Sequence, residues 1–125
     1  LHFDKIGLKD GRNTSFYMLG WTPGTYDAHN MLFNIITMSS GPGSGAWNSG
    51  RYTNPKVEEL SVKIASEMDA EKRTAMIHEA MKIHKEDFGH IPLHQQALAW
   101  GVRETVANIP QAANDAVMLK YIRMK

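Results

Sequence analysis

Apolar residues recur at helical spacing in the second half of the chain, where they predict two consecutive helices. Asn54 and Pro55 precede the first repeat, in the order typical of an N-cap followed by the first helical position. Because intervals of three and four residues match the 3.6-residue turn, the apolar positions that follow share one helix face. That face comprises Val57, Leu60, Ile64 and Met68.

A second helix is predicted directly afterwards, with Asp69 as its N-cap. An aspartate cap followed by Glu71 suits the positive end of a helix dipole. We expect this helix to be stopped by Gly89, because glycine readily takes the left-handed conformation found at helix ends. Its buried stripe comprises Met76, Ile77, Ala80, Met81 and Ile83.

The rest of the chain is predicted to hold strands, one further helix and a loop. Residues 16–21 are a short apolar and aromatic run, typical of a buried strand, which Thr22-Pro23-Gly24 ends. Ile6 and Leu8 alternate with polar neighbours, and Asp10-Gly11 can turn such a strand into a hairpin with that run. Residues 28–39 have helical apolar spacing, with Asp27 as the N-cap candidate. Further strands are expected at 91–93, 98–102 and 116–124, and a glycine-rich loop at 40–53.

Composition limits the class of protein. The chain has 125 residues, enough for one domain with a core, and its 42% hydrophobic and 22% charged residues are typical of a globular protein. Acidic and basic residues are interspersed with a net charge of +1, so nothing indicates nucleic acid or an anionic membrane as a partner. No apolar run approaches the ~20 residues of a membrane span. The lack of cysteine excludes disulfides and thiolate chemistry.

The sequence contains no catalytic constellation, so we do not expect an enzyme. It has neither a cysteine nucleophile nor a Gly-x-Ser-x-Gly elbow, and its glycine-rich loop lacks the Gly-Lys pair of a phosphate loop. Six histidines leave a histidine-based nickel or zinc site as an alternative. His-Glu-x-x-His is absent, since Lys82 stands where the second histidine would follow His78. His90 and His94 are four apart on expected extended chain, where both can point to one side. Spacing leaves open whether they converge with His29 or His84.

The stretch from Gly20 to Asp27 is the best candidate for a binding site. Trp21, Tyr26 and the Asp27 carboxylate come where a predicted strand ends in a loop, an arrangement that can build a small-molecule site. Gly20 interrupts the strand, as glycine often does where a ligand or another backbone approaches closely. The alternative interpretation is a strand-turn-helix corner in which Trp21 fills the core.

A set of motifs occurs in a fixed order over residues 14–104. The set comprises Gly20-Trp21-Thr22, Asp27-Ala28-His29-Asn30, Asn48, Tyr52, Asn54-Pro55, Val57-Glu58-Glu59-Leu60, Asp69, Arg73, Ala80 and Ile91-Pro92-Leu93. In this order the chain resembles the C-terminal part of the family 5 extracellular solute-binding proteins. Members of that family deliver dipeptides, oligopeptides, glutathione or nickel complexes to ABC importers. They are much longer, so the chain looks like a C-terminal fragment.

The resemblance implies an α/β fold, part of a type II periplasmic-binding-protein-like architecture. In that architecture two lobes of mixed sheet flanked by helices close on a ligand through a hinge. Residues 1–94 would belong to the second large lobe, and residues 95–125 would cross the hinge as a tail packed on the first lobe. A chain without its partner lobe leaves apolar surface uncovered, so we expect it to self-associate, with exchange of its C-terminal strand.

By the same resemblance, the function is that of the substrate-binding component of an ABC importer, which binds its solute in a cleft between the lobes. The chain by itself is expected to be inactive, because half of that cleft is missing. The partners would be a small peptide or peptide-like ligand and the importer's membrane permease, without a cofactor. The location would be periplasmic, or extracellular and membrane-anchored in a Gram-positive cell. In the family the tryptophan and tyrosine of this stretch would stack on the ligand, and the backbone would pair with it as an added strand does. The ligand-binding residues that the resemblance implies are Gly20, Trp21, Thr22, Gly24, Tyr26 and Asp27.

One position departs from the family pattern. Peptide-binding members carry an aspartate three residues after the tryptophan, where it binds the amino terminus of the ligand. Here that position is Gly24, and the nearest carboxylate is Asp27. The departure leaves open whether Asp27 takes that role, and whether the ligand is a modified peptide, an opine-like compound or a glutathione-like molecule.

Overall fold

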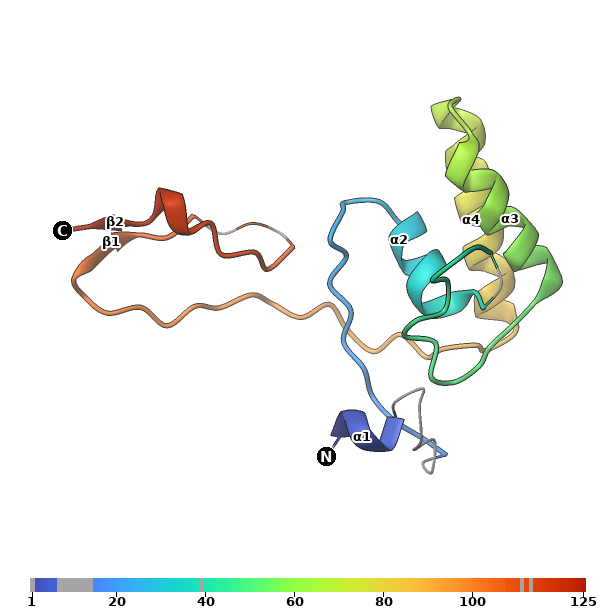
Figure 1. Cartoon of the computed structure of the whole chain (residues 1–125), viewed down its shortest axis with the longest axis horizontal. Helices are drawn as coiled ribbons and strands as arrows, with labels where there is room; N and C mark the ends of the chain where they lie inside the picture. The colour runs from blue at the N-terminus through green and yellow to red at the C-terminus, as the bar shows by residue number, and fades with distance from the viewer. Residues whose placement is uncertain (1, 7–14, 39, 111, 113) are drawn as a thin grey trace.

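The computed structural model describes residues 2–6, 15–38, 40–110, 112 and 114–125. These residues form a mostly helical small domain and a two-stranded antiparallel hairpin (Figure 1). The elements are α1 (His2–Ile6), α2 (His29–Met31), η1 (Leu32–Ile36), α3 (Pro55–Ser66), α4 (Ala70–Glu86), β1 (Val106–Asn108), η2 (Leu119–Tyr121) and β2 (Arg123–Met124).

The two strongest helix predictions, α3 and α4, are confirmed together with their caps. The Asn54 side chain accepts hydrogen bonds from the backbone N–H groups of Lys56, at 2.9 Å, and Val57, at 3.4 Å. Asp69 does the same for the first turn of α4, at 3.0 and 3.1 Å. Each cap satisfies N–H groups that have no partner inside the helix, which fixes where the helix begins.

The end of α4 differs in detail from the prediction. The helix stops at Glu86, and the residue with a positive φ is Phe88 (φ 53°), not Gly89. Gly89 has a different role, since a Cβ there would lie 2.7 Å from ring atoms of both His84 and Tyr52. The glycine is required for space, because the two rings pack against its backbone.

The core lies between α2, η1, α3 and α4. Its buried side chains are Leu32, Ile35, Ile36, Val57, Leu60, Ile64 and Ala80. The predicted face of α3 is therefore confirmed except at Met68, which is 94% exposed because α3 ends before it. On α4 only Ala80 of the predicted stripe is fully buried, while the larger apolar side chains pack at the edge of the core.

The helix predicted over residues 28–39 is shorter and partly of another type. It begins as α2, continues as the π-helical turn η1 and ends at Ile36. The N–H group of Thr37 donates to the carbonyl oxygen of Leu32, five residues earlier, at 2.9 Å. Residues 40–53 form the expected loop, up to the N-cap of α3.

The strand predictions are mostly wrong. Residues 16–21, 91–93 and 98–102 are not paired as strands, and Ile6 belongs to helix α1. Of the last predicted strand only β2 forms, pairing with β1 as Val106↔Met124 and Asn108↔Arg123 with an irregular register. Leu8 and the Asp10-Gly11 turn lie outside the described residues. Alternation and β-branched composition describe a side-chain pattern, whereas a hydrogen-bonded ladder also needs a second strand alongside. The expected α/β fold is therefore only weakly present, because the described residues are mostly helical.

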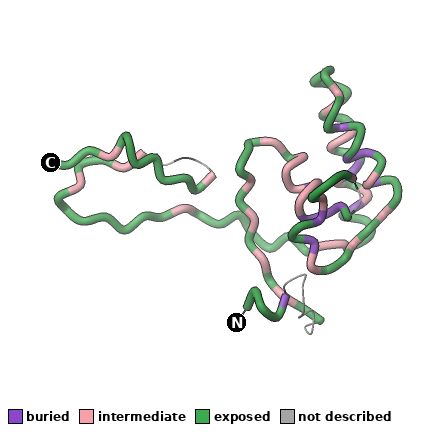
Figure 2. Tube along the Cα trace, viewed as in Figure 1, coloured by how far each residue is buried: buried purple, intermediate pink, exposed green. Residues whose placement is uncertain are grey.

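After α4 the chain leaves the helical part. Residues 91–102 run as an extended segment towards the β1–β2 hairpin, which lies at the far end of the molecule (Figure 1). Figure 2 shows that this segment is exposed along nearly its whole length, while the buried residues gather around the packed helices. Among the described helices, none combines the length and the apolar character needed to cross a membrane.

Candidate functional site

Trp21 is held in place by the helical part of the chain. Its ring packs against the core cluster, and its indole Nε1–H donates to Oδ1 of Asn30 at 3.0 Å. The Trp47 ring lies 6.2 Å away, centroid to centroid. The indole is thus half-buried, with its one polar group satisfied inside the protein, so the core-filling interpretation of Trp21 describes most of its contacts.

The neighbouring candidates face open space. Gly20, Thr22, Gly24 and Tyr26 are all exposed, and a Cβ on either glycine would meet no atom within 4 Å. Between described residues, no backbone–backbone hydrogen bond involves positions 17–26. This part of the candidate site therefore offers an accessible main chain and one exposed aromatic ring.

Asp27 is already occupied by a cation of the protein itself. The guanidinium of Arg73 donates to both carboxylate oxygens, at 3.1 Å to Oδ1 and 2.6 Å to Oδ2. The backbone N–H of His29, the first residue of α2, donates to Oδ1 at 3.0 Å. The N-cap position itself is held by Ala28 and not by Asp27 as predicted. The hydrogen bond from Arg73 lowers the pKa of Asp27, against the opposing effect of partial burial. The Asp27 carboxylate is thus engaged in contacts within the protein.

Arg73 is the residue that sequence reasoning missed. Arg73 lies on α4. Besides its ion pair with Asp27, its Nε donates to the carbonyl oxygen of Ile64, near the end of α3, at 3.1 Å. One side chain therefore joins α3, α4 and the loop before α2. The motif order contained Asp27 and Arg73, but nothing in their spacing shows that they meet.

A second cluster surrounds His84, near the end of α4. His84 is 6% exposed, and its Nε2 lies 2.9 Å from Nδ1 of His90. The Tyr52 ring meets His84 edge to face with centroids 4.9 Å apart. Burial, together with the charge of His90, lowers the pKa of His84 to about 4. Burial also lowers the pKa of His90.

Asp87 closes this cluster on its solvent side. Its Oδ2 accepts hydrogen bonds from the Tyr52 hydroxyl and from Nδ2 of Asn54, both at 2.7 Å. The hydrogen bond from Tyr52 is the main cause that lowers the pKa of Asp87, and burial mainly raises that of Tyr52. The cluster ties the end of α4 to the cap of α3.

The histidines do not converge on a metal site in the described part of the chain. There, no three His, Asp or Glu side chains group as metal ligands would. His29 contacts the carbonyl oxygen of Ser61 through Nε2 at 3.0 Å, and His94 contacts Gln96 rather than His90. The closest approach to a metal site is thus the pair His84 and His90.

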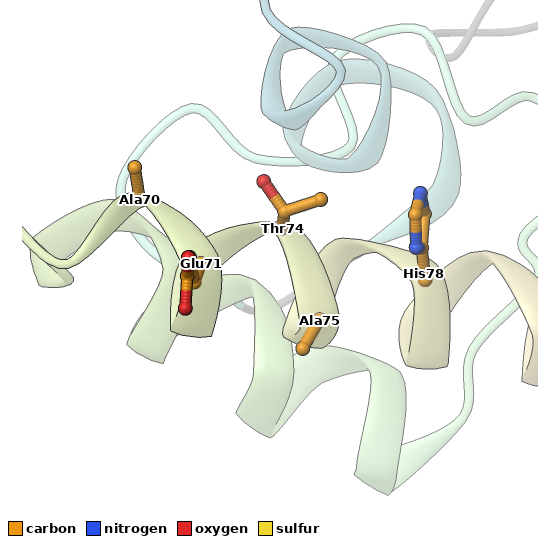
Figure 3. Close-up of a pocket in the computed structure, with 5 residues that line it drawn as sticks. All are labelled: Ala70, Glu71, Thr74, Ala75 and His78. Atoms are coloured by element: carbon orange, nitrogen blue, oxygen red, sulfur yellow. The ribbon is translucent and has the colours of Figure 1, made fainter.

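One surface depression lies elsewhere. It measures about 460 Å³, and its lining comes from α4 alone: Ala70, Glu71, Thr74, Ala75 and His78. Figure 3 shows these side chains along one helix. None of the candidate residues from Gly20 to Asp27 lines it, so it is a shallow surface hollow with no convergent chemistry.

Searches against protein-family models, curated proteins and solved structures found no match to this chain.

Proposed function

We propose that the chain is part of a solute-binding protein that captures a peptide or peptide-like molecule for an ABC importer. The observation that carries the proposal is the open main chain of residues 20–24, held next to a fixed tryptophan. An extended peptide recognised by strand addition needs such a backbone, with pockets or rings beside it for side chains. The family resemblance supplies the substrate class and the importer.

In this proposal the fold is completed by further chain. Residues 1–94 form part of the second lobe of a type II two-lobed fold, and residues 95–125 cross the hinge to the first lobe. The protein works at the cell surface or in the periplasm and passes its ligand to the membrane permease. Binding, rather than catalysis, is its task.

The Asp27–Arg73 pair limits the class of ligand that the proposal allows. Because Arg73 already neutralises Asp27, this carboxylate does not replace the aspartate missing at Gly24. The proposed ligand is therefore one whose amino terminus is blocked, modified or bound by another part of the protein. A glutathione-like or N-modified peptide fits this requirement better than a free dipeptide.

The test is a titration of the ¹⁵N-labelled intact protein, in which both lobes are present, with glutathione, an N-acetylated tripeptide and the same tripeptide with a free amine. Backbone shifts in residues 20–26, larger for the blocked peptide, are expected. Trp21→Ala should weaken ligand binding by roughly 2 kcal/mol and thereby remove these shifts. Trp100→Ala should leave the shifts unchanged. Absence of any shift at millimolar ligand, with both variants folded, contradicts the proposal.

A histidine-based nickel or zinc site is the second candidate, and the His84–His90 pair favours it. Two imidazole nitrogens 2.9 Å apart are close enough to bind one ion at the usual ~2.0–2.1 Å. The two rings would need water to complete the ion's shell. Shifts at His84 and His90 on adding one equivalent of nickel, absent in His90→Gln, would support this candidate.

A further inference from the structure

Three aromatic rings from separate parts of the chain form a row beside the candidate site. The Trp47 ring, from the glycine-rich loop, lies 6.2 Å from the Trp21 ring, centroid to centroid. The Phe3 ring of α1 in turn meets Trp47 edge to face, with centroids 6.4 Å apart. Within the described residues, Trp47 and Phe3 lie outside the core cluster and are 45% and 60% exposed. The row therefore starts against the core at Trp21 and ends in solvent at Phe3.

Trp47 is held in position by the backbone of its loop. Its N–H group donates to the carbonyl oxygen of Asn34, at 2.9 Å, and the next residue, Asn48, is fully buried. The N–H group of Gly45 donates to the carbonyl oxygen of Phe33 at 2.8 Å. The loop is thus fastened to η1 around Trp47. A ring that is fixed before a ligand arrives loses little conformational entropy when it binds one.

Helix α1 places Phe3 on this ring. Nε2 of His2 lies 3.1 Å from the carbonyl oxygen of Met18, and Ile6, at the end of the helix, is 3% exposed. The helix therefore lies beside the segment that leads into the candidate site (Figure 1). Phe3 comes between these two contacts in the sequence, yet it remains mostly exposed. A rotation of its side chain can move the ring off Trp47 while Ile6 stays buried.

A peptide paired with residues 20–24 would bring a side chain to this row. In an added strand, side chains directly opposite each other lie about 4.5–5.5 Å apart and diagonal ones about 7–8 Å, which aromatic side chains can bridge. A ligand side chain next to Trp21 is thus within reach of Trp47, whose ring is 6.2 Å away. The contact with Phe3 indicates which chemistry suits this position, because a phenyl ring already packs there.

We propose that Trp47 selects an aromatic side chain in the ligand, and that Phe3 occupies this position while the ligand is absent. The inference rests on the function proposed above, because the paired peptide is what carries the side chain to Trp47. An aromatic ligand side chain displaces Phe3 and replaces its ring contact, whereas a small side chain leaves Phe3 in place. The ligand is then an N-modified peptide with an aromatic residue rather than a glutathione-like molecule.

Calorimetric titrations of the intact protein test the competition, with two N-acetylated tripeptides that differ only in a central phenylalanine or alanine. The phenylalanine peptide should bind about tenfold more tightly. Phe3→Ala should raise its affinity by a further factor of about two to ten, as expected for one aromatic pair, and leave the alanine peptide unchanged. Phe88→Ala removes another exposed phenyl ring and should change neither affinity. An unchanged or lowered affinity of the phenylalanine peptide in Phe3→Ala overturns the proposal.

Variants of Trp47 test which ring makes the selection. Trp47→Ala should abolish the difference between the two peptides, whereas Trp47→Phe, which keeps an aromatic ring, should retain part of it. In protein labelled with fluorotryptophan, the ¹⁹F resonance of Trp47 is the one missing from Trp47→Phe. Phe3→Ala should shift this resonance in the free protein but not in the complex with the phenylalanine peptide. Equal shifts in both states would mean that Phe3 stays on Trp47, which overturns the proposal.

The same titrations separate this inference from the function on which it rests. If both peptides bind and shift residues 20–24 but do so with equal affinity, selection by Trp47 is overturned and the proposed function stands. If neither peptide binds to the folded protein, the proposed function is overturned and the inference with it.

Discussion

Arg73 and Asp27 are 46 positions apart in the chain, yet the guanidinium grips both oxygens of the carboxylate. The pair fastens the loop that carries Trp21 and Tyr26 to the α3–α4 helices. The candidate binding stretch is thus fixed at its C-terminal end by an ion pair, while between described residues no backbone–backbone hydrogen bond involves positions 20–24.

Arg73→Lys tests how much the bidentate hydrogen bond between Arg73 and Asp27 contributes to the free energy of unfolding. Lysine keeps the charge but not the planar fork, and it loses the hydrogen bond to Ile64. Because the side chains are 27% and 39% exposed, we expect a loss of only about 1 kcal/mol in the free energy of unfolding. Urea denaturation measures it, with the exposed Arg51→Lys as control. A loss no larger than in the control would mean that the pair does not fasten the loop.

The buried histidine predicts how stability depends on pH. Burial lowers the pKa of His84 from 6.5 to about 4, so the unfolded chain takes up a proton more readily than the folded protein. The contribution of neutral His84 to the free energy of unfolding is therefore fully present above pH 6.5. It should be lost as the pH drops from 6.5 towards 4. In His84→Asn, urea midpoints measured across this range should fall less steeply. His78→Gln, at an exposed position of the same helix, should keep the wild-type slope.

Gly89→Ala should disturb the contact between Tyr52 and His84. The added methyl group would lie 2.7 Å from ring atoms of both residues, so one ring must move. We expect a loss of about 1–3 kcal/mol in unfolding free energy, seen in thermal or urea denaturation. Gly101→Ala is the control, since a Cβ there meets nothing within 4 Å. Similar stability of the two variants would contradict the packing described at Gly89.

Asn48 is a buried polar side chain that holds the loop before α3. Its Nδ2 donates to the carbonyl oxygens of Ile36, at 3.1 Å, and Tyr52, at 2.8 Å, and its Oδ1 accepts from the N–H of Tyr52 at 3.1 Å. Asn48→Ala leaves these backbone groups without a partner in a buried place. We expect a loss of about 2–4 kcal/mol, against little change for Asn114→Ala in the C-terminal region. A small loss would indicate that water replaces the side chain.

The candidate site could be predicted only in part. Sequence reasoning selected Trp21 and Tyr26 as rings that stack on a ligand, with core filling as the alternative for Trp21. The structure packs Trp21 against the core and leaves Tyr26 exposed. The sequence left Asp27 open between a helix cap and a site for a ligand cation. In the structure the carboxylate accepts from the N–H of His29, one residue beyond the N-cap Ala28, and from Arg73, whose approach no local spacing predicts.

The sequence left open whether His90 and His94 converge with His29 or His84. The structure brings His90 against His84, because a helix end and a turn bring together residues that the sequence places on different elements.

Local chemistry determined what the sequence alone could predict. Helices α3 and α4, with caps at Asn54 and Asp69, follow from contacts within a few residues, and so does the apolar face from Val57 to Ile64. The tertiary structure decided the rest, because strands, ion pairs and buried polar clusters need partners distant in the chain. Residues 16–21 show the difference most clearly. Their apolar and aromatic composition is that of a buried strand, but whether a ladder forms depends on a second backbone, which the composition does not specify.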